Sequence, residues 1–429
     1  MPFRLTTLED NRYILYVRPR EAGIKTLRQN NMRAVLQLMR VRQTASVTDI
    51  SAVIRLSKTT IKKILDHLEA LHLVVSAGKG LSTEEGGKKP ELFRFNRFFG
   101  YVISIHITPD SLLSAATDMG GELVAYKKEE VGQERSLSSI IERVARAALD
   151  IIAAKTSSRE TLIGIVISLP GLADSSQGLS IYSPHYPEWG RDVPFGKMLR
   201  TALGEDVETP IYIDCVNRYQ AIAEQVRGVA AGASNFIIID ALNEGLGSGI
   251  VLHDTVLRGS QGLSGEIGHM AVNPIDGVPC ICGHRGCFEA MVSAKRILGL
   301  AESARARGER SVLFTGTEQR PLGLDAICAG AAQGDALSLA LIDDVARWFL
   351  VGIGNIIMVN DPQLIVIQGQ YVKAGDCFLS RLREGIKRIG LPEVAKKVRI
   401  EYSTLGEERG VIGGAAFVLG DFFAARLTF

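Results

Sequence analysis

The sequence has no long apolar run. No window of its 429 residues approaches the roughly 20 consecutive apolar residues that a membrane-spanning helix needs. Residues 1–20 carry six charged side chains where a secretory leader would have an apolar segment. These absences argue against a membrane-spanning or exported protein, so we expect a cytoplasmic protein in a reducing compartment.

Cysteine is scarce, with six residues in the chain, but three of the six lie close together. In a reducing compartment, clustered cysteines bind metal more often than they pair with each other. With His269, the thiols of Cys280, Cys282 and Cys287 form a complete tetrahedral set for a structural Zn²⁺ site. The alternatives are a disulfide pair with a spare thiol, a metal-free buried or redox cluster, and a metal site in which His284 replaces His269.

The composition, with 46% hydrophobic and 22% charged residues, is typical of a globular protein, and 429 residues exceed what one core usually holds. The formal net charge of +2 hides an asymmetry. Residues 1–98 contain eighteen Lys and Arg against nine Asp and Glu, whereas the remainder contains 31 against 38. A basic head on an acidic body predicts that the head meets a polyanion.

Three helical patterns follow one another in this basic head. An apolar stripe with helical spacing covers residues 32–39, a short second helix is expected over 48–55, and Ser57 is placed to cap a third helix reaching Leu71. This order is the helix-turn-helix arrangement, whose last helix meets DNA near its N-terminal end. The predicted DNA contacts on that helix are Ser57, Lys58, Thr59, Thr60, Lys62 and Lys63.

Two expected strands, 73–76 and 92–95, flank a segment rich in glycine and lysine. Such a hairpin beside a helix-turn-helix resembles the wing of a winged-helix domain, in which Lys88 and Lys89 would attract phosphate groups. The head therefore predicts a double-stranded DNA operator as a partner. The alternatives are a basic three-helix bundle that never touches DNA and a module that docks protein.

Strand-like and helix-like segments alternate from Gly100 onward, which is an α/β pattern. The clearest helix is expected over 138–154. The clearest strands are expected over 101–107, 112–118, 163–168, 211–214, 236–239 and 249–252.

Residues 265–269, Gly-Glu-Ile-Gly-His, and 280–289, Cys-Ile-Cys-Gly-His-Arg-Gly-Cys-Phe-Glu, resemble the signature of the ROK family. This family groups bacterial sugar kinases with transcriptional repressors of sugar metabolism. The turn between the two halves is one residue longer here than in the family. The resemblance implies that Glu266, His269 and Glu289 border a sugar pocket and that the metal holds the loop presenting them. The alternative is that the two glutamates are solvated surface carboxylates.

The resemblance also implies the architecture. The body is expected to be a two-lobed, actin-like and ribonuclease H-like α/β fold behind a small winged helix-turn-helix domain. The expected parts are an N-terminal arm at 1–22, the DNA-binding domain at 23–97 and the body at 98–429, with lobes at approximately 98–215 plus the C-terminal helix and at 216–410.

The segments that bind ATP in family kinases are altered. Residues 106–110 read His-Ile-Thr-Pro-Asp in place of Asp-Ile-Gly-Gly-Thr, and Pro109 has no N–H to offer a phosphate. Val216 stands at the position of the catalytic base, and Asp214 could replace it only through a two-residue shift. We therefore expect no catalytic residue and no enzyme activity. The other altered turns are Asn243-Glu244 and Gln368-Gly369-Gln370.

The sugar side of the body follows the family more closely. Residues 168–172 match a strand-end turn, and His185 stands near an asparagine that often contacts a sugar hydroxyl. Trp189 matches a family tryptophan, whose ring could stack on a sugar or fill the core.

Together these features predict a cytoplasmic transcriptional regulator, a repressor of genes for sugar metabolism or transport. We expect a homodimer or homotetramer whose body senses a sugar or sugar phosphate. The alternatives are a sugar kinase with a DNA-binding head and a regulator whose body binds a protein instead of a sugar.

Overall fold

The computed structural model describes residues 24–80, 89–156, 160–242, 245–315 and 322–426. The chain forms two compact units, one of residues 1–227 with 406–429 and the other of residues 228–405. The first unit contains the head, the first lobe of the body and the last helix. The expected N-terminal arm, 1–22, and Lys88 lie outside the described residues.

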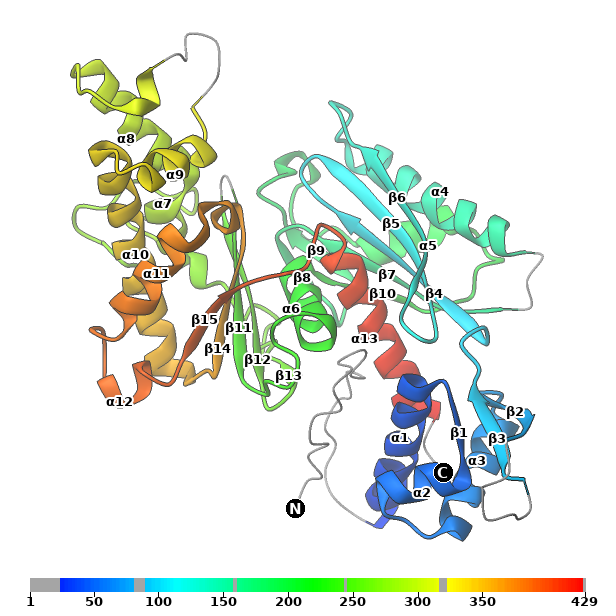
Figure 1. Ribbon diagram of the computed structural model, residues 1–429. Coiled ribbons are helices and arrows are strands. Elements are labelled where there is room, and N and C mark those ends of the chain that lie inside the picture. Colours follow the sequence, from blue (N-terminus) through cyan, green and yellow to red (C-terminus); the bar gives the residue numbers. More distant parts are fainter. Residues whose placement is uncertain (1–23, 81–88, 157–159, 243–244, 316–321, 427–429) are drawn as a thin grey trace. The chain divides into compact units, whose positions relative to one another are not determined.

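The head has the predicted winged helix-turn-helix order (Figure 1). Its three strands pair antiparallel in the order β1-β3-β2, and the apolar stripe of the first helix is fully buried. The short strand β1 was not predicted, because three residues are too few to show a period. The elements of the head are α1 (Ile24–Arg42), β1 (Thr44–Ser46), α2 (Val47–Ile54), α3 (Lys58–Ala70), β2 (Val74–Lys79) and β3 (Glu91–Phe95).

Local side chains fix the ends of the two helices of this motif. Ser46 and Asp49 form a capping box at the start of α2, and α2 ends at Arg55, whose φ of 59° is left-handed. The hydroxyl of Ser57 accepts the N–H of Thr60 at 3.1 Å, so Ser57 caps α3 as the sequence predicts. The tight turn between the helices therefore follows from residues in the turn itself.

The first lobe is a five-stranded sheet in the order β10-β7-β4-β5-β6, with helices on both faces. Strands β4, β5 and β6 are antiparallel neighbours, whereas β7 and β10 run parallel to β4. Its elements are β4 (Gly100–Ile107), β5 (Ser111–Asp118), β6 (Leu123–Glu130), α4 (Leu137–Lys155), β7 (Thr161–Leu169), β8 (Leu172–Asp174), β9 (Leu179–Tyr182), η1 (Pro187–Trp189), α5 (Phe195–Leu203), β10 (Ile211–Cys215), α6 (Val216–Arg227) and α13 (Arg409–Arg426).

The second unit repeats this topology. Its sheet has the order β13-β12-β11-β14-β15, again with an antiparallel meander on one side and parallel strands on the other. The repetition confirms the two-lobed, ribonuclease H-like fold. Its elements are β11 (Phe236–Ala241), β12 (Leu246–Leu252), β13 (Thr255–Val256), η2 (Ile267–His269), α7 (Phe288–Val292), α8 (Ala294–Ala306), η3 (Val312–Phe314), α9 (Leu324–Ala332), α10 (Ala336–Asn360), β14 (Leu364–Gly369), η4 (Gln370–Ala374), α11 (Gly375–Ile386), α12 (Pro392–Ala395) and β15 (Arg399–Tyr402).

The division between the lobes falls after α6, at residue 227, rather than at 215. Every residue of α6 from Arg218 to Val226 is buried, and the helix packs along α13. A Cβ at Gly413 of α13 would overlap the carbonyl oxygen of Tyr219 in α6. Because the two backbones approach this closely, α6 belongs to the first lobe.

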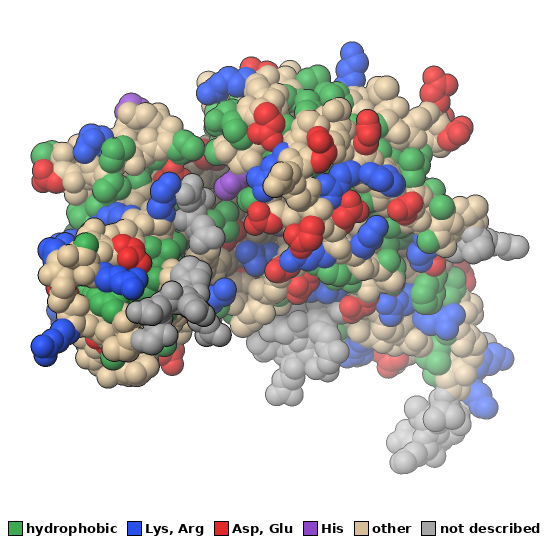
Figure 2. All heavy atoms as spheres, turned by 90° about the horizontal axis from the view of Figure 1, so that it is seen from above, with side chains coloured by type: hydrophobic (Ala, Val, Ile, Leu, Met, Phe, Trp, Pro, Cys, Tyr) green, Lys and Arg blue, Asp and Glu red, His purple; other side chains and the backbone are tan. Residues whose placement is uncertain are grey.

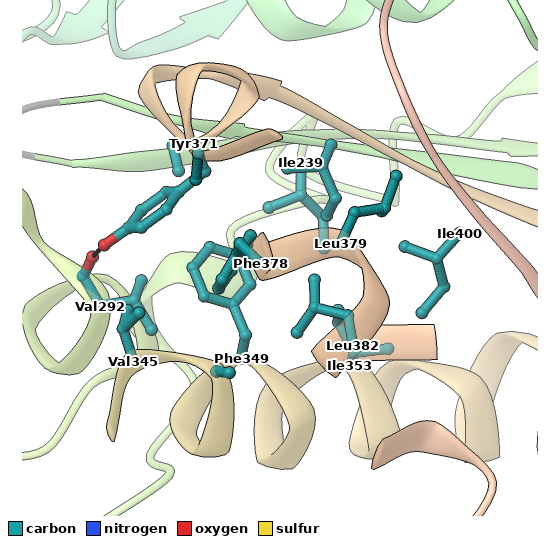
Figure 3. Close-up of a cluster of buried hydrophobic side chains, with 14 of the residues drawn as sticks. Ile239, Val292, Val345, Phe349, Ile353, Tyr371, Phe378, Leu379, Leu382 and Ile400 are labelled. Atoms are coloured by element: carbon teal, nitrogen blue, oxygen red, sulfur yellow. Dashed lines mark hydrogen bonds between the residues drawn. The ribbon is translucent and has the colours of Figure 1, made fainter. Parts of the chain in front are cut away.

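The core of the second unit centres on an aromatic group (Figure 3). The ring of Phe349 in α10 lies 5.4 Å from Phe288, 5.0 Å from Tyr371 and 5.1 Å from Phe378, in edge-to-face geometry. The hydroxyl of Tyr371 donates to the carbonyl oxygen of Val292 at 2.5 Å, so its polar end is satisfied inside the core.

Among the described residues, no helix is long and apolar enough to cross a membrane. On the face shown in Figure 2, basic and acidic side chains are interspersed rather than separated. Ion pairs such as Arg143 with Glu129, at 2.8 Å, belong to the first lobe. The basic excess counted in the sequence lies in residues 1–98.

Replacing Phe349 by Ala should destabilise the second unit by about 3–5 kcal/mol, because the cavity forms at the centre of the aromatic group. The matched control is Phe98→Ala, a side chain that is 64% exposed, and its effect should stay within about 0.5 kcal/mol. Urea unfolding curves of the full chain measure both. An equal effect of the two substitutions would contradict this description of the core.

Candidate functional site

The predicted metal ligands lie together in one loop of the second unit. His269 ends the short helix η2, Cys280 and Cys282 follow in the loop, and Cys287 caps the start of α7. Backbone bridges from Ala271 to Cys287 and from Pro279 to Arg285 hold the loop closed on itself.

The ligand atoms are spaced as a tetrahedral metal site requires. One ligand atom from each residue lies within 4.8 Å of all the others. Cys282 Sγ lies 3.5 Å from Cys287 Sγ, and Cys280 Sγ lies 3.7 Å from His269 Nδ1. Tetrahedral Zn²⁺ with ordinary bond lengths places sulfur atoms about 3.8 Å apart and sulfur and nitrogen about 3.6 Å apart. The donor set and these two separations therefore fit a closed zinc site.

Glycines allow the loop to close. Gly286 has a φ of 66°, and a Cβ there would overlap the carbonyl oxygen of Asn273. Gly283 also has a positive φ, 89°, but nothing lies within 4 Å of its Cβ position. Close backbone approach therefore requires glycine at 286, whereas only the backbone conformation favours glycine at 283.

Glu289 lies directly beside the metal ligands. Its Oε1 is 3.0 Å from Cys280 Sγ and 3.4 Å from His269 Nδ1, and its Oε2 accepts the N–H of Leu246. Glu266 precedes η2 and is exposed. The loop thus brings together three of the four residues predicted to bind a ligand. The fourth, His185, is half-buried in the first unit, in the loop before η1.

Trp189 fills the core of the first lobe. Only 5% of its surface is exposed, its ring stacks on Tyr186 at 4.3 Å, and its Nε1 donates to the carbonyl oxygen of Arg135. Both the ring and the indole N–H of Trp189 therefore have partners within the protein. Of the two roles that the sequence left open, the structure supports the core.

In the turn that corresponds to the phosphate-binding turn of family kinases, a side chain of the turn itself occupies the backbone N–H groups. The hydroxyl of Thr108 accepts the N–H of Ser111 at 2.8 Å and that of Asp110 at 3.3 Å. Pro109, between them, has no N–H. The backbone donors of this turn are therefore engaged, and the exposed carboxylate of Asp110 adds negative charge there.

The position of the kinase base is also changed. Val216 is the first residue of α6, and the preceding strand ends with Asp214 and Cys215. Asp214 is 1% exposed and forms an ion pair with Arg218, Nη1 to Oδ1 at 2.5 Å. Sequence reasoning did not assign a role to Arg218, although an acid and a base four residues apart at a helix start is a recognisable signal.

On the head, Lys58, Thr59 and Lys63 of α3 are exposed, and Lys89 is exposed before β3. Three other predicted contacts, Ser57, Thr60 and Lys62, have partners inside the head. The Thr60 hydroxyl lies 2.8 Å from that of Ser57. Lys62 pairs with Asp66 at 3.1 Å and with Glu91 of the wing strand β3 at 2.9 Å.

Known proteins are similar to this chain over most of its length. The xylose repressor of Caldicellulosiruptor bescii is 26% identical over 93% of this chain and 97% of its own length. The glucokinase of Halalkalibacterium halodurans is 30% identical over 74% of this chain and 94% of its own. The crystal structure of a ROK family transcriptional regulator, a homologue of the Escherichia coli MLC protein, has a TM-score of 0.77 and 26% identity, covering 94% of this chain and 98% of that one. The ROK family model matches residues 102–421, so this chain belongs to the ROK family.

Proposed function

We propose that this protein is a cytoplasmic transcriptional repressor that binds double-stranded DNA and responds to a sugar or sugar phosphate. The winged helix-turn-helix head carries this proposal, because α3 presents Lys58, Thr59 and Lys63 to solvent at its start. The similarity to a xylose repressor extends over the head, whereas the similarity to a glucokinase covers about as much as the body alone. The target genes are those of sugar metabolism or transport.

The DNA face comprises the start of α3 and the wing. Lysines there neutralise phosphates, and threonines reach base edges in the major groove. Its residues are Ser57, Lys58, Thr59, Thr60, Lys62, Lys63, Lys88 and Lys89. Repressors of this type read paired half-sites, so we propose a homodimer or homotetramer. An effector that prefers the conformation with the wrong half-site spacing would lower operator affinity.

The effector site that we propose lies at the metal loop. Carboxylates are good acceptors for sugar hydroxyl groups, and a metal-bound loop holds them in fixed positions. Glu266, His269 and Glu289 of the second unit would contact the effector, and His185 remains a separate prediction for the first unit. A regulator whose body binds a protein instead of a sugar is the second candidate, and a screen of sugars and sugar phosphates by calorimetry separates the two.

Zinc is the metal that we propose for His269, Cys280, Cys282 and Cys287. All four positions of the tetrahedron come from the protein, so the ion would stabilise the loop and offer no open position for catalysis. The ion is therefore structural in this proposal.

Purified protein should contain about one zinc ion per chain, as expected for a closed four-ligand site. Cys282→Ser should lose the metal, whereas Cys377→Ser, outside the loop, should retain it. Within the loop, Gly286→Ala should lose the metal because the chain cannot close, and Gly283→Ala should retain more of it. Elemental analysis after preparation without chelator checks these outcomes. Retention of zinc in Cys282→Ser would exclude the proposed ligand set.

DNA binding should weaken steeply with salt, because lysines release counterions from the phosphates. Lys58→Ala and Lys63→Ala should each reduce the slope of log affinity against log salt by about one, for all sequences alike. Thr59→Ala should change sequence preference instead. Lys197→Ala, an exposed lysine of α5 in the body, is the control for loss of charge. Failure of the full chain to retard the DNA upstream of its own gene at low salt would refute the repressor proposal.

The body should not phosphorylate sugars. The Thr108 hydroxyl accepts the N–H of Ser111 in the turn that would bind phosphate, and Asp214 forms an ion pair with Arg218. Phosphate binding therefore lacks backbone donors, and general-base catalysis lacks a carboxylate to accept the proton. ADP release with Mg·ATP and hexoses or amino sugars should stay at background. Val216→Asp alone should not restore it. Turnover of about 1 s⁻¹, ordinary for an enzyme, would show that the body is a kinase, and Asp214→Asn would then test the base.

A further inference from the structure

A buried arginine of the head contacts the body. Arg40, near the end of α1, is 4% exposed. Its Nε donates to the carbonyl oxygen of Met119 and its Nη2 to that of Gly120, both at 3.2 Å. The guanidinium carbon lies 5.4 Å from the centre of the Phe423 ring in α13. All of these partners belong to the body, so α1 of the head inserts a cation into the first lobe.

The receiving turn, Asp118–Glu122 between β5 and β6, is built around arginines. The carboxylate of Asp118 accepts Nε of Arg97 at 2.7 Å, and Arg97 lies on the segment that joins the head to the body. From α6, Arg227 donates to the carbonyl oxygen of Gly121. Three consecutive carbonyl groups of the turn thus accept from Arg40 or Arg227. The turn is a fixed set of acceptors between the head and the helices of the first lobe.

The contact of Arg40 determines the orientation of the head more than it stabilises the docked arrangement. The acceptors that Arg40 uses are neutral carbonyl groups, and its Nη1 has no hydrogen-bond partner among the described residues. Burial lowers the pKa of Arg40 to about 10, against the attraction of the Asp118 carboxylate and with a smaller contribution from Arg227, so the side chain remains a cation at neutral pH. A buried cation with incomplete partners gains little net free energy. The planar guanidinium can nevertheless donate to both carbonyl groups in only one orientation.

The head can then have two states, one docked on the body and one undocked. In the docked state, Arg40 is dehydrated and its direction is set by the turn. In an undocked state the guanidinium regains water, which offsets the lost hydrogen bonds. A contact that gains little net free energy leaves the balance between such states open to a shift by DNA or an effector.

We propose that Arg40 is a positioning residue that orients the DNA-binding head on the body and thereby sets the half-site spacing that the protein reads. This inference rests on the proposed repressor function, because half-site spacing has meaning only for a DNA-binding oligomer. In the docked state each head has one direction relative to its own first lobe. In the undocked state the head is held by the connecting segment alone and accepts many spacings.

The first experiment measures operator affinity against spacing. A half-site is selected from random DNA, and two inverted copies are placed at spacings that vary by single base pairs over one helical turn. For the wild-type chain, a change of half a turn should lower the affinity about 100-fold, since the heads then face opposite sides of the duplex. In Arg40→Ala this dependence should fall below about tenfold, while affinity for a single half-site stays within about threefold because the reading helix is unchanged.

Three further variants separate direction from charge and from folding. Arg42→Ala removes the same charge from an exposed position of α1 and should keep the spacing dependence. Arg40→Lys should restore it only in part, because an ammonium group lacks the planar fork. Arg40→Met preserves volume and should behave like Arg40→Ala. Wild-type spacing dependence in both Arg40→Ala and Arg40→Met would overturn the proposal, as would an equal loss in Arg42→Ala.

Hydrogen exchange provides a measurement that does not involve DNA. In the full chain, Arg40→Ala should speed exchange in the 118–122 turn and around Phe423 by about tenfold or more, since these segments lose their contact with the head. Arg42→Ala should not. Unchanged exchange in Arg40→Ala would also overturn the proposal. If the wild-type chain bound no DNA but Arg40→Ala showed the faster exchange, the repressor function would fail while docking through Arg40 would stand.

Discussion

The close approach of α13 to α6 and to the sheet is the contact on which the first unit depends. The chain leaves this unit after residue 227, builds the second unit, and returns only for its last helix. Glycines line the returning helix where it meets the sheet and α6, because Gly410 faces His106 and Gly413 faces Tyr219. This helix also reaches the head, through Phe423 beneath Arg40. One element thus contacts the strand ends, α6 and the DNA-binding domain of the same unit.

The two units differ in what their polar side chains contact. In the second unit, Glu289 Oε1 lies 3.4 Å from His269 Nδ1, beside the clustered cysteines. In the first, the Thr108 hydroxyl accepts the backbone amides of its turn, and Asp214 forms an ion pair with Arg218. These contacts agree with the similarity of the whole chain to ROK family repressors.

Much of the fold was predictable because its signals are local. The apolar stripe of α1, the cap at Ser57 and the four metal ligands can each be read within about twenty residues, and the described structure brings each set together. The rest depends on contacts between residues far apart in the sequence. The engagement of Lys62 by Glu91, the burial of Trp189 and the assignment of α6 to the first unit all require the tertiary arrangement. No periodicity in the sequence encodes such contacts.

The self-satisfied turn at Thr108 has a consequence for substitutions in this turn. In a turn whose amides bind a phosphate group, a single substitution that weakens phosphate binding does not disturb the backbone of the turn. Here the Thr108 hydroxyl satisfies the amides of Asp110 and Ser111, so removing it first would leave polar groups without partners. A phosphate-binding turn could form here only if the Thr108 side chain and the neighbouring proline changed together. Single substitutions at this turn therefore cost stability without freeing its amides for a ligand.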